Sequence, residues 1–381
     1  MTPRIAVLRD FHAEDWPSMD LCADQLLLQL PDGVDVCPPF RRLAGRLPGL
    51  GRSRTARNLD RVVNRFAVYG GRASAVRGRF DAYHIVDHSY AHLVHHLPAR
   101  STGVYCHDID AFRCLVDSGS PQRPRWFRSM AARILAGMEK AAIVFHSTIA
   151  VRKEIESFDL VDPSKLVHAP YGVSPIFSDR RDPSIRLPWL AALDGVPWFL
   201  HVGSCIPRKR IDVLLDALAE IRPELPDVKF VKVGGDWSDD HRRQIDGKAL
   251  DKSIVHRPKA SESELAEIYR RAPLVVMPSD AEGFGLPVIE ALACGAIVLA
   301  SDIPALRESG GSAAVFAPAG DVAAWSAAIV QLLKLPSSAP SRDSRLKWAQ
   351  RFSWAKHAAV IASAYSKLLA TSKNRGPVAI R

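Results

Sequence analysis

Apolar residues occur along the chain in two patterns that alternate with each other. Short runs such as residues 5–8 are continuously apolar, which is typical of strands buried on both faces of a parallel sheet. Longer segments between them, such as residues 19–30, carry apolar residues at helical spacing. The alternation of short strands with amphipathic helices predicts an α/β protein built from doubly wound parallel sheets.

One interruption divides this alternation into two domains. Residues 178–197 are rich in Arg, Asp and Pro without sustained periodicity, as in an interdomain linker. We expect domains over residues 1–175 and 176–352, then a C-terminal helix over 353–381 that is frayed after Ser372. The strands expected in the first domain are 5–8, 34–37, 82–86, 103–106, 143–145 and 166–169. Those expected in the second are 198–202, 229–233, 254–256, 274–277, 297–299 and 314–316.

Residues 274–302 combine an apolar strand, a glycine-rich turn, a short helix and a second apolar strand, which predicts one βαβ unit. Pro287 suits the first helical position, and Gly295 suits the C-terminal stop. Two carboxylates interrupt the apolar pattern, Glu282 in the turn and Glu290 in the expected first helical turn. Because a carboxylate beside a buried helix is unfavourable unless it is paired, we expect a ligand that carries hydroxyl groups.

The loop between these carboxylates can bring backbone amides to an anion at the start of the helix, where the helix dipole also favours negative charge. Its residues are Gly283, Phe284, Gly285 and Leu286. Phosphate is the anion that we expect there. The alternative is a helix entry whose glycines serve only the turn and whose glutamates are solvated.

A second loop supplies cations to the same domain. Gly203 follows the strand expected over residues 198–202, and Arg208 and Lys209 come five and six residues after it, ahead of a helix expected from Ile211. Ligands of open α/β sheets bind at the carboxyl edge of the strands, so the spacing indicates an anion site. Two solvated cations in a turn are the alternative.

The segment from Glu282 to Glu290 reads E-G-F-G-L-P-x-x-E and is followed by A-x-A-x-G. It resembles the nucleotide-sugar signature of the retaining glycosyltransferases of family 4. The resemblance implies the GT-B fold, with two facing Rossmann-like domains and a C-terminal helix that crosses back to the first domain. It also implies transfer of a sugar from a nucleoside diphosphate sugar to a hydroxyl acceptor, without a cofactor or a metal site. A glycan or a lipid-linked saccharide is the expected acceptor, with mannosyl transfer as one option.

The resemblance assigns roles in the second domain. It makes Lys209 the main ligand of the diphosphate and Arg208 an assisting one, in a loop that also contains Gly203 and Ser204. Ser204 stands where one subfamily has an arginine. Glu282 resembles the carboxylate that holds hydroxyls of the donor sugar, and Glu290 resembles the one that binds ribose. The amides of residues 283–286 complete the expected donor site.

In the first domain, Cys106-His107-Asp108 follows an expected strand and resembles the family's H-D element. There the histidine contacts the donor sugar near its reacting carbon, so His107 is the expected catalytic residue beside Lys209 and Glu282. Trp16 and Asp20 are the candidates for the acceptor side. The loop over residues 9–17, which contains Trp16, lacks the glycine pair that many members of the family carry there.

Other functions use the same fold or the same charge. A sugar-nucleotide epimerase and a phosphorylase are alternatives among enzymes, although no pyridoxal-phosphate lysine context is recognisable. A non-catalytic nucleotide-sugar-binding subunit and a basic nucleic-acid-binding protein are alternatives of another class. The presence of Lys209, Glu282 and Glu290 argues against both.

Charge and cysteine content refine the expected setting. The net charge is +10, from 51 basic and 41 acidic residues. No nucleic-acid module accompanies it, so we expect an anionic membrane surface as the partner, with a solvated basic face as the alternative. The absence of an apolar leader, of a long apolar run and of paired cysteines predicts a cytoplasmic protein, with peripheral attachment to the inner membrane face as an option. The arginines that concentrate this charge are Arg41, Arg42, Arg46, Arg52, Arg54, Arg57, Arg61 and Arg65, and Arg123, Arg125, Arg128 and Arg133 around Trp126 and Phe127.

Overall fold

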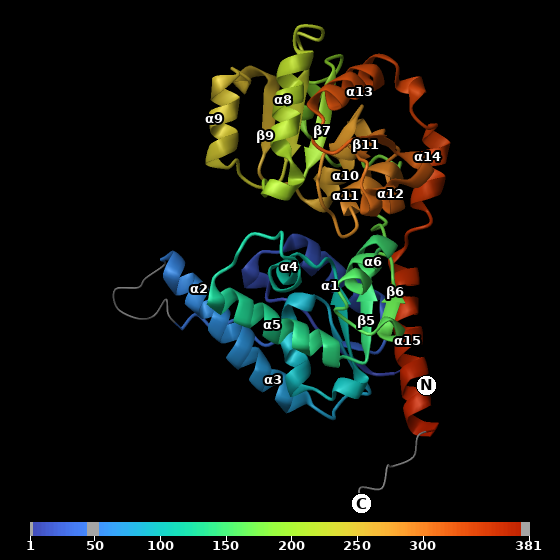
Figure 1. The fold of residues 1–381 in the computed structure, drawn as a ribbon. Coiled ribbons are helices and arrows are strands. Elements are labelled where there is room, and N and C mark those ends of the chain that lie inside the picture. The colour runs from blue at the N-terminus through green and yellow to red at the C-terminus, as the bar shows by residue number, and fades with distance from the viewer. Residues whose placement is uncertain (1–2, 44–52, 375–381) are drawn as a thin grey trace, which may run out of the picture. The chain divides into compact units, whose positions relative to one another are not determined.

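The structure is a computed structural model that describes residues 3–43 and 53–374. The chain forms two compact units, Met1–Gly172 with Trp354–Arg381, and Val173–Ser353. Each unit contains one six-stranded sheet, and all paired strands in both sheets run parallel. Helices flank each sheet (Figure 1). The α/β class that the apolar pattern predicts is therefore confirmed.

The sheet of the first unit has the order β2-β1-β3-β4-β5-β6. The expected strands are present, and their ends differ by one or two residues because the last ladder bonds depend on neighbouring strands. The strands are β1 (Ile5–Leu8), β2 (Gly33–Asp35), β3 (Ala82–Ile85), β4 (Thr102–Cys106), β5 (Ile143–His146) and β6 (Leu166–His168). The helices are α1 (Pro17–Gln29), α2 (Arg54–Val63), α3 (Tyr69–Val76), α4 (Asp110–Val116), α5 (Arg125–Lys140), α6 (Ile149–Ser157) and α15 (Trp354–Asn374).

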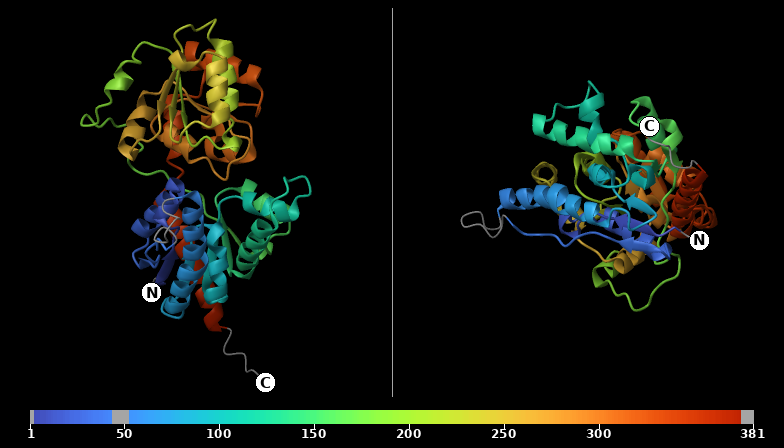
Figure 2. Two further views of the ribbon diagram at one scale, coloured as in Figure 1. Left: turned by 90° about the vertical axis from the view of Figure 1, so that its left-hand side faces the viewer. Right: turned by 90° about the horizontal axis from the view of Figure 1, so that it is seen from below.

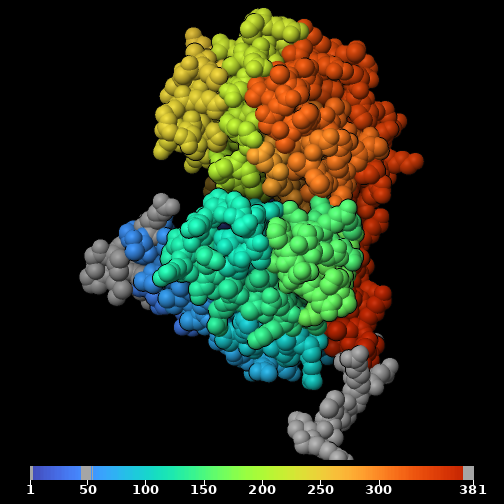
Figure 3. Space-filling model, in the orientation of Figure 1, coloured from blue at the N-terminus to red at the C-terminus, as the bar shows by residue number. Residues whose placement is uncertain are grey.

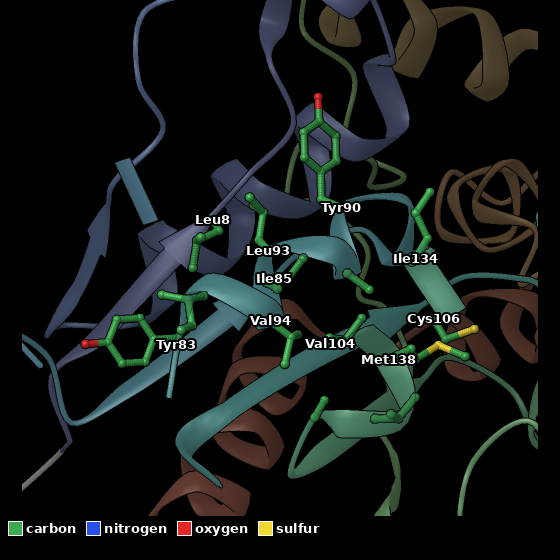
Figure 4. Close-up of a cluster of buried hydrophobic side chains, with 14 of the residues drawn as sticks. Leu8, Tyr83, Ile85, Tyr90, Leu93, Val94, Val104, Cys106, Ile134 and Met138 are labelled. Carbon is green, nitrogen blue, oxygen red and sulfur yellow. The ribbon is translucent and has the colours of Figure 1, made fainter. Parts of the chain in front are cut away.

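Both faces of this sheet are buried, as continuous apolar strands require. Alternate strand residues pack against α5 and the short helical segment His88–His96 on one face, and α15 covers the other (Figure 2). On the α15 face, the hydroxyl of Tyr365 donates to the carbonyl oxygen of Tyr83 at 2.9 Å. The C-terminal helix is thus an integral part of the first unit. Figure 4 labels Leu8, Tyr83, Ile85, Tyr90, Leu93, Val94, Val104, Cys106, Ile134 and Met138 in the cluster on the opposite face.

The sheet of the second unit has the order β12-β11-β10-β7-β8-β9. The chain builds outward from β7 through β8 to β9 and then resumes with β10 on the other side of β7. The topological switch point therefore lies at the carboxyl ends of β7 and β10, the place where open α/β sheets bind ligands. The strands are β7 (Trp198–Val202), β8 (Lys229–Val233), β9 (Ile254–Arg257), β10 (Val275–Met277), β11 (Val298–Ser301) and β12 (Val315–Ala317).

Helices cover both faces of this second sheet as well. The capping box expected at the start of α10 is confirmed, since Ser261 Oγ accepts from the amide of Glu264 at 3.2 Å and Glu264 Oε2 accepts from the amide of Ser261 at 2.8 Å. The helices are α7 (Pro188–Ala191), α8 (Ile211–Ile221), α9 (Asp239–Gly247), α10 (Glu262–Arg271), α11 (Leu286–Ala293), α12 (Pro304–Gly310), α13 (Val322–Lys334) and α14 (Arg342–Ala349).

The ends of the expected segments need two corrections. Residues 178–197, expected as a linker, belong to the second unit, where they include α7 and bury Leu190 and Leu193 in its core. A helix of four residues is too short for its periodicity to stand out. The helix α15 continues to Asn374, past the fraying expected after Ser372, and residues 375–381 lie outside the described residues. No helix in the described ranges is long and apolar enough to cross a membrane.

Candidate functional site

Two loops of the second unit meet at the switch point between β7 and β10. The loop after β7 carries Arg208 and Lys209, and the loop after β10 carries Glu282. A backbone hydrogen bond of 2.9 Å from the amide of Asp280 to the carbonyl of Arg208 joins the loops. The parallel order of the sheet thus brings together residues more than seventy positions apart in sequence.

The carboxylate of Glu282 is the centre of this cluster. Its side chain is only 6% exposed. Lys209 Nζ donates to Oε1 at 2.5 Å, and Ser279 Oγ donates to the same oxygen at 2.7 Å. Arg208 Nη1 donates to Oε2 at 3.1 Å and to the carbonyl of Ala281 at 2.7 Å. The cations and the carboxylate are therefore a buried ion-pair network and not solvated side chains in turns.

Opposing effects set the charge of Glu282. Burial acts to raise the pKa of this carboxyl, because an ionised group loses hydration in the interior. The nearby charges of Lys209 and Arg208, with the hydrogen bonds from Lys209 and Ser279, outweigh burial and bring the pKa below its usual range. Glu282 is thus an anion in the physiological pH range, and it fixes the positions of two cations.

The turn between Glu282 and α11 is shaped by Gly285. This residue has φ +94°, and a Cβ atom there would lie 2.6 Å from Leu306 Cδ2, so both backbone and packing require glycine. The neighbouring Phe284 ring is buried and packs edge-on against Phe352, with ring centroids 5.7 Å apart. Phe284 can therefore meet a ligand only through its backbone. The helix begins at Leu286, with Pro287 as its second residue.

Glu290 differs from Glu282 in its surroundings. The expectation that it lies in the first helical turn is wrong, because α11 starts at Leu286 and Glu290 is its fifth residue. Its buried side chain accepts a 3.3 Å hydrogen bond from the hydroxyl of Tyr269 at Oε2. Burial raises the pKa of Glu290 to about 8, since the hydrogen bond from Tyr269 offsets only part of the lost hydration and the charge of Glu262 acts in the same direction as burial. The protein alone thus holds Glu290 as a neutral acid near pH 7.

The loop after β7 begins with a glycine that the site requires. Gly203 has φ +151°, and a Cβ atom there would lie 3.3 Å from His201 Nε2 and 3.9 Å from Lys209 Cε. A side chain at this position would be strained and would crowd the His201 ring, while its contact with Lys209 would be an ordinary van der Waals contact. Ser204, the next residue, is exposed. Gly203 therefore lies next to Lys209, and Ser204 belongs to the same loop.

Two buried basic residues beside this loop were not anticipated. His201 Nδ1–H donates to the carbonyl of Val276 at 3.0 Å, and burial lowers the pKa of His201 to about 3, so the ring is neutral. Lys232 is fully buried on β8. A lysine between the apolar residues Val231 and Val233 was a visible signal, because an isolated buried ammonium is unfavourable without partners.

His107 lies in the first unit, directly after β4. Its ring nitrogens both have protein partners: Nε2–H donates to the carbonyl of Val86 at 2.8 Å, and Nδ1 accepts from the hydroxyl of Tyr171. Burial lowers the pKa of His107 and His88 acts in the same direction, although Asp87 opposes them. The ring is therefore a neutral, doubly hydrogen-bonded group.

Asp87 and His88 are neighbours of His107 that the sequence analysis did not select. Asp87 Oδ1 lies 4.0 Å from His107 Nε2 and 3.3 Å from His88 Nδ1, and Ser89 Oγ donates to Asp87 Oδ2 at 2.5 Å. Their position after β3, the strand next to β4, was the available signal. The sequence contains thirteen histidines, so the type alone could not single out His88.

The two acceptor-side candidates are at the start of α1. Trp16 precedes the helix and is largely exposed. Asp20 Oδ1 forms an ion pair with Arg9 Nη2 at 3.0 Å and lies 2.8 Å from His12 Nδ1. Asp20 is thus committed to Arg9, whereas the Trp16 ring is accessible.

In the described part of the chain, no three His, Cys, Asp or Glu side chains are arranged to hold a metal ion. Within the same residues, which include all six cysteines, no disulfide bond is present.

Comparisons with known proteins agree with this geometry. Residues 196–335 match the family model described as Glycosyl transferases group 1. The O-antigen chain mannosyltransferase B of Escherichia coli is 29% identical over 270 residues, which cover 69% of each chain. A D-inositol 3-phosphate glycosyltransferase of Mycolicibacterium smegmatis is 31% identical over 46% of this chain. That alignment covers 41% of the relative, so the chain spans less than half of the relative's length.

Solved structures share the fold over nearly the whole chain. Sucrose-phosphate synthase from Thermosynechococcus elongatus gives a TM-score of 0.73 at 20% identity and covers 97% of this chain and 100% of that one. Anabaena Alr3699/HepE in complex with UDP gives 0.69 at 15% identity, with 95% and 99% covered. The protein therefore has the GT-B glycosyltransferase fold. The part of its second unit that matches the group 1 glycosyltransferase model includes Glu282 to Glu290, the segment that carries the resemblance.

The raised pKa of Glu290 predicts a pH-dependent cost to stability. The folded state holds the proton of Glu290 up to a pKa of about 8, whereas the unfolded chain releases it at the lower, ordinary pKa of a glutamate. The free energy of unfolding therefore falls as the pH rises from that ordinary pKa towards 8. Glu290→Gln cannot ionise and escapes this loss. We expect the variant to gain on the wild type by about 3 kcal/mol between pH 5 and 8. Urea unfolding of the nucleotide-free proteins measures it, with exposed Glu139→Gln as the control, and parallel pH profiles would contradict it.

Proposed function

We propose that the protein transfers a sugar from a nucleoside diphosphate sugar to a hydroxyl acceptor with retention of configuration, as a family 4 glycosyltransferase. One observation carries the proposal: the buried Glu282 is clamped by Lys209 and Arg208 at the switch point of a domain that matches the group 1 glycosyltransferases. Such a cluster offers fixed cations to the diphosphate and a carboxylate oxygen to hydroxyl groups.

The names of the relatives support a nucleotide sugar as the donor. One structural neighbour was solved with UDP, and one relative is a mannosyltransferase. We propose a nucleoside diphosphate hexose for this chain, with mannosyl transfer as one option. A glycan or a lipid-linked saccharide is the proposed acceptor. No cofactor or resident metal is part of this proposal, because Lys209 and Arg208 supply the positive charge.

Charge development explains what the cluster contributes to the reaction. The bond between the sugar's anomeric carbon and the diphosphate oxygen breaks with its electron pair on the oxygen. The acceptor oxygen bonds to the same face of that carbon, and its proton moves to the departing phosphate. Lys209, Arg208 and the N-terminus of α11 stabilise the negative charge that develops on the diphosphate.

The two glutamates serve different parts of the donor in this proposal. Oε1 of Glu282 accepts from two protein donors and Oε2 from one, so Oε2 keeps acceptor capacity for a sugar hydroxyl. Glu290 binds ribose as a neutral acid beside Tyr269. The sugar reacts and the ribose does not, which makes Glu282 the catalytic member of the pair.

In the first unit, His107 is the proposed contact to the donor sugar near its reacting carbon. Both ring nitrogens are engaged, so a direct contact through Nδ1 requires the hydrogen bond with Tyr171 to open. The exposed Trp16 ring is the proposed platform for an acceptor sugar. Asp20 is less suited to this role because Arg9 and His12 already bind its Oδ1 atom.

Two alternatives are less well supported. The relatives whose names state an activity are transferases or a synthase, and none of those reported above is an epimerase. A non-catalytic subunit would keep the donor site without turnover. A measurement of sugar release from a bound donor distinguishes the two, because an enzyme releases the sugar and a non-catalytic subunit does not.

We also propose that an anionic membrane surface is a partner of the first unit. Three large apolar residues of this unit are exposed, Leu59 (47%), Val62 (50%) and Trp126 (68%). They lie among arginines of α2 and α5. Both helices contribute to the face of this unit in Figure 3. Arg65 contributes little to the surface, because its side chain is only 18% exposed and pairs with Glu14 at 2.8 Å. Arg46 and Arg52 lie outside the described residues.

Donor binding tests the proposed function directly. A ligand that binds only the folded protein stabilises it, by about 2.7 kcal/mol at one hundred times Kd. We expect one class among UDP-, GDP-, ADP- and TDP-sugars to raise the melting temperature, and the matching free sugars to have no effect. A panel without any stabilising nucleotide would contradict the proposal.

Loss of the central cation should weaken binding of the diphosphate. Lys209→Ala removes a charge-assisted contact in a largely buried cluster, so we expect a loss of about 1.5–3 kcal/mol in affinity. Calorimetry with the nucleoside diphosphate that stabilises the wild type measures the change. Lys248, which pairs with Asp216 at 3.2 Å in the same unit, is the control position. Unchanged affinity in folded Lys209→Ala would remove Lys209 from the site.

Membrane association should depend on charge and salt. Each cation near an anionic surface contributes about 1 kcal/mol and loses it as salt screens the charge. We expect co-sedimentation with phosphatidylserine vesicles, none with neutral vesicles, and weaker binding of the exposed double variant Arg57→Glu/Arg128→Glu. Arg243→Glu in the second unit is the control. Equal binding to both vesicle types would refute an electrostatic attachment.

A further inference from the structure

Lys232 is a fully buried lysine on β8 that the proposed mechanism does not use. Its strand, Lys229–Val233, is otherwise packed between the two apolar faces of the sheet. Moving an ammonium group out of water is costly unless other groups replace its hydration. The partners of Lys232 therefore indicate why a lysine occupies this position.

Those partners are backbone carbonyls of two turns. Lys232 Nζ donates to the oxygen of Gly203 at 3.0 Å, to the oxygen of Gly235 at 3.3 Å, and to the oxygen of Gly234. Beside these carbonyls, the ammonium also has a hydrogen bond with the Cys205 side chain and lies 5.4 Å from the centre of the Trp237 ring. Gly203 lies in the turn that ends β7, and the other two lie in the turn that ends β8. Lys232 thus joins the ends of neighbouring strands.

The two turns touch each other and admit no side chains. Gly234 and Gly235 have φ of +90° and +63°. A Cβ atom on Gly234 would lie 3.1 Å from the oxygen of Gly203, and one on Gly235 would lie 3.1 Å from Ser204 Cα. The turns are therefore packed backbone against backbone over Lys232.

The inward carbonyls fix the direction of the amides on the same peptide groups. The chain contains no cis peptide bonds in its described residues, and in a trans peptide the N–H points opposite to the C=O. The amide of Ser204 therefore points away from Lys232, as does the amide of Asp236. Neither amide donates to an acceptor among the described residues, and both residues are exposed. Such outward amides at the end of parallel strands form an anion-binding surface.

We propose that Lys232 is a positioning residue for the diphosphate: it holds the carbonyls of both turns inward, so that the amides of Ser204 and Asp236 face the phosphoryl oxygens. This inference rests on the proposed function. It also accounts for a cation missing from the loop surface, since Ser204 stands where one subfamily has an arginine. Lys232 supplies positive charge from beneath the loop. It binds the carbonyl of Gly203, the residue that also adjoins Lys209.

Lys232→Met tests this role, because methionine keeps the length of the side chain but donates no hydrogen bonds. We expect the variant to bind inorganic pyrophosphate at least about tenfold more weakly than the wild type. Binding of the free nucleoside, chosen from uridine, guanosine, adenosine and thymidine as the one that binds the wild type, should change less than twofold. Lys229→Met on the same strand is the matched control, since its Nζ donates to the carbonyl of Lys252, away from both glycine turns.

The outcomes separate this inference from the proposed function. A wild type that does not bind pyrophosphate overturns both. If the wild type and Lys232→Met bind pyrophosphate equally tightly, the inference alone is overturned. If the variant loses pyrophosphate binding and nucleoside binding equally, the inference is also overturned, because Lys232 then has a purely structural role.

If Lys232→Met does not fold, a measurement on the wild-type protein tests the same inference. Amide NMR shifts of Ser204 and Asp236, assigned by selective labelling, should move with pyrophosphate concentration along the binding curve. Amide signals of both residues that stay in place at saturation would contradict the inference.

Discussion

A carboxylate taken out of water has to be compensated, and the compensation of Glu282 determines how the second unit is built. Lys209, Arg208 and Ser279 all donate to its two oxygens. These donors can meet only if the loops after β7 and β10 are adjacent, which the order of the sheet provides. The buried ion pair therefore depends on the parallel topology, which places the two loops side by side.

The same principle gives different answers for other buried ionisable groups. Glu290 has a tyrosine hydroxyl but no cation, so burial raises its pKa to about 8 and it is protonated near pH 7. Lys232 forms no direct ion pair among the described residues but binds three carbonyl oxygens, which satisfy an ammonium without neutralising it. His107 is neutral and doubly hydrogen-bonded. The site thus combines an anion, a neutral acid and fixed cations, although the E-x7-E motif presents its two glutamates as equivalent.

Local patterns predicted a large part of this structure. Continuous apolar runs located the strands, the Ser261 to Glu264 capping box located the start of α10, and the glycine-rich motif located α11 and Glu282. Other features depend on contacts between distant segments, which no local pattern encodes. Tyr171 engages His107 from 64 residues away, and Glu14 makes Arg65 structural from 51 residues away. The four-residue helix α7 was too short to be detected within a polar segment.

The central claim is that Lys209 acts on the diphosphate in the position that Glu282 gives it. A double-mutant cycle tests this claim, with Lys209→Ala, Glu282→Gln and the combined variant titrated calorimetrically with the nucleoside diphosphate. Residues in contact show coupling of about 0.5–3 kcal/mol, and independent residues add to within about 0.5 kcal/mol. We predict a coupling of at least about 1 kcal/mol in binding free energy. Additive losses would show that the ion pair and the diphosphate site are independent, and would contradict the account.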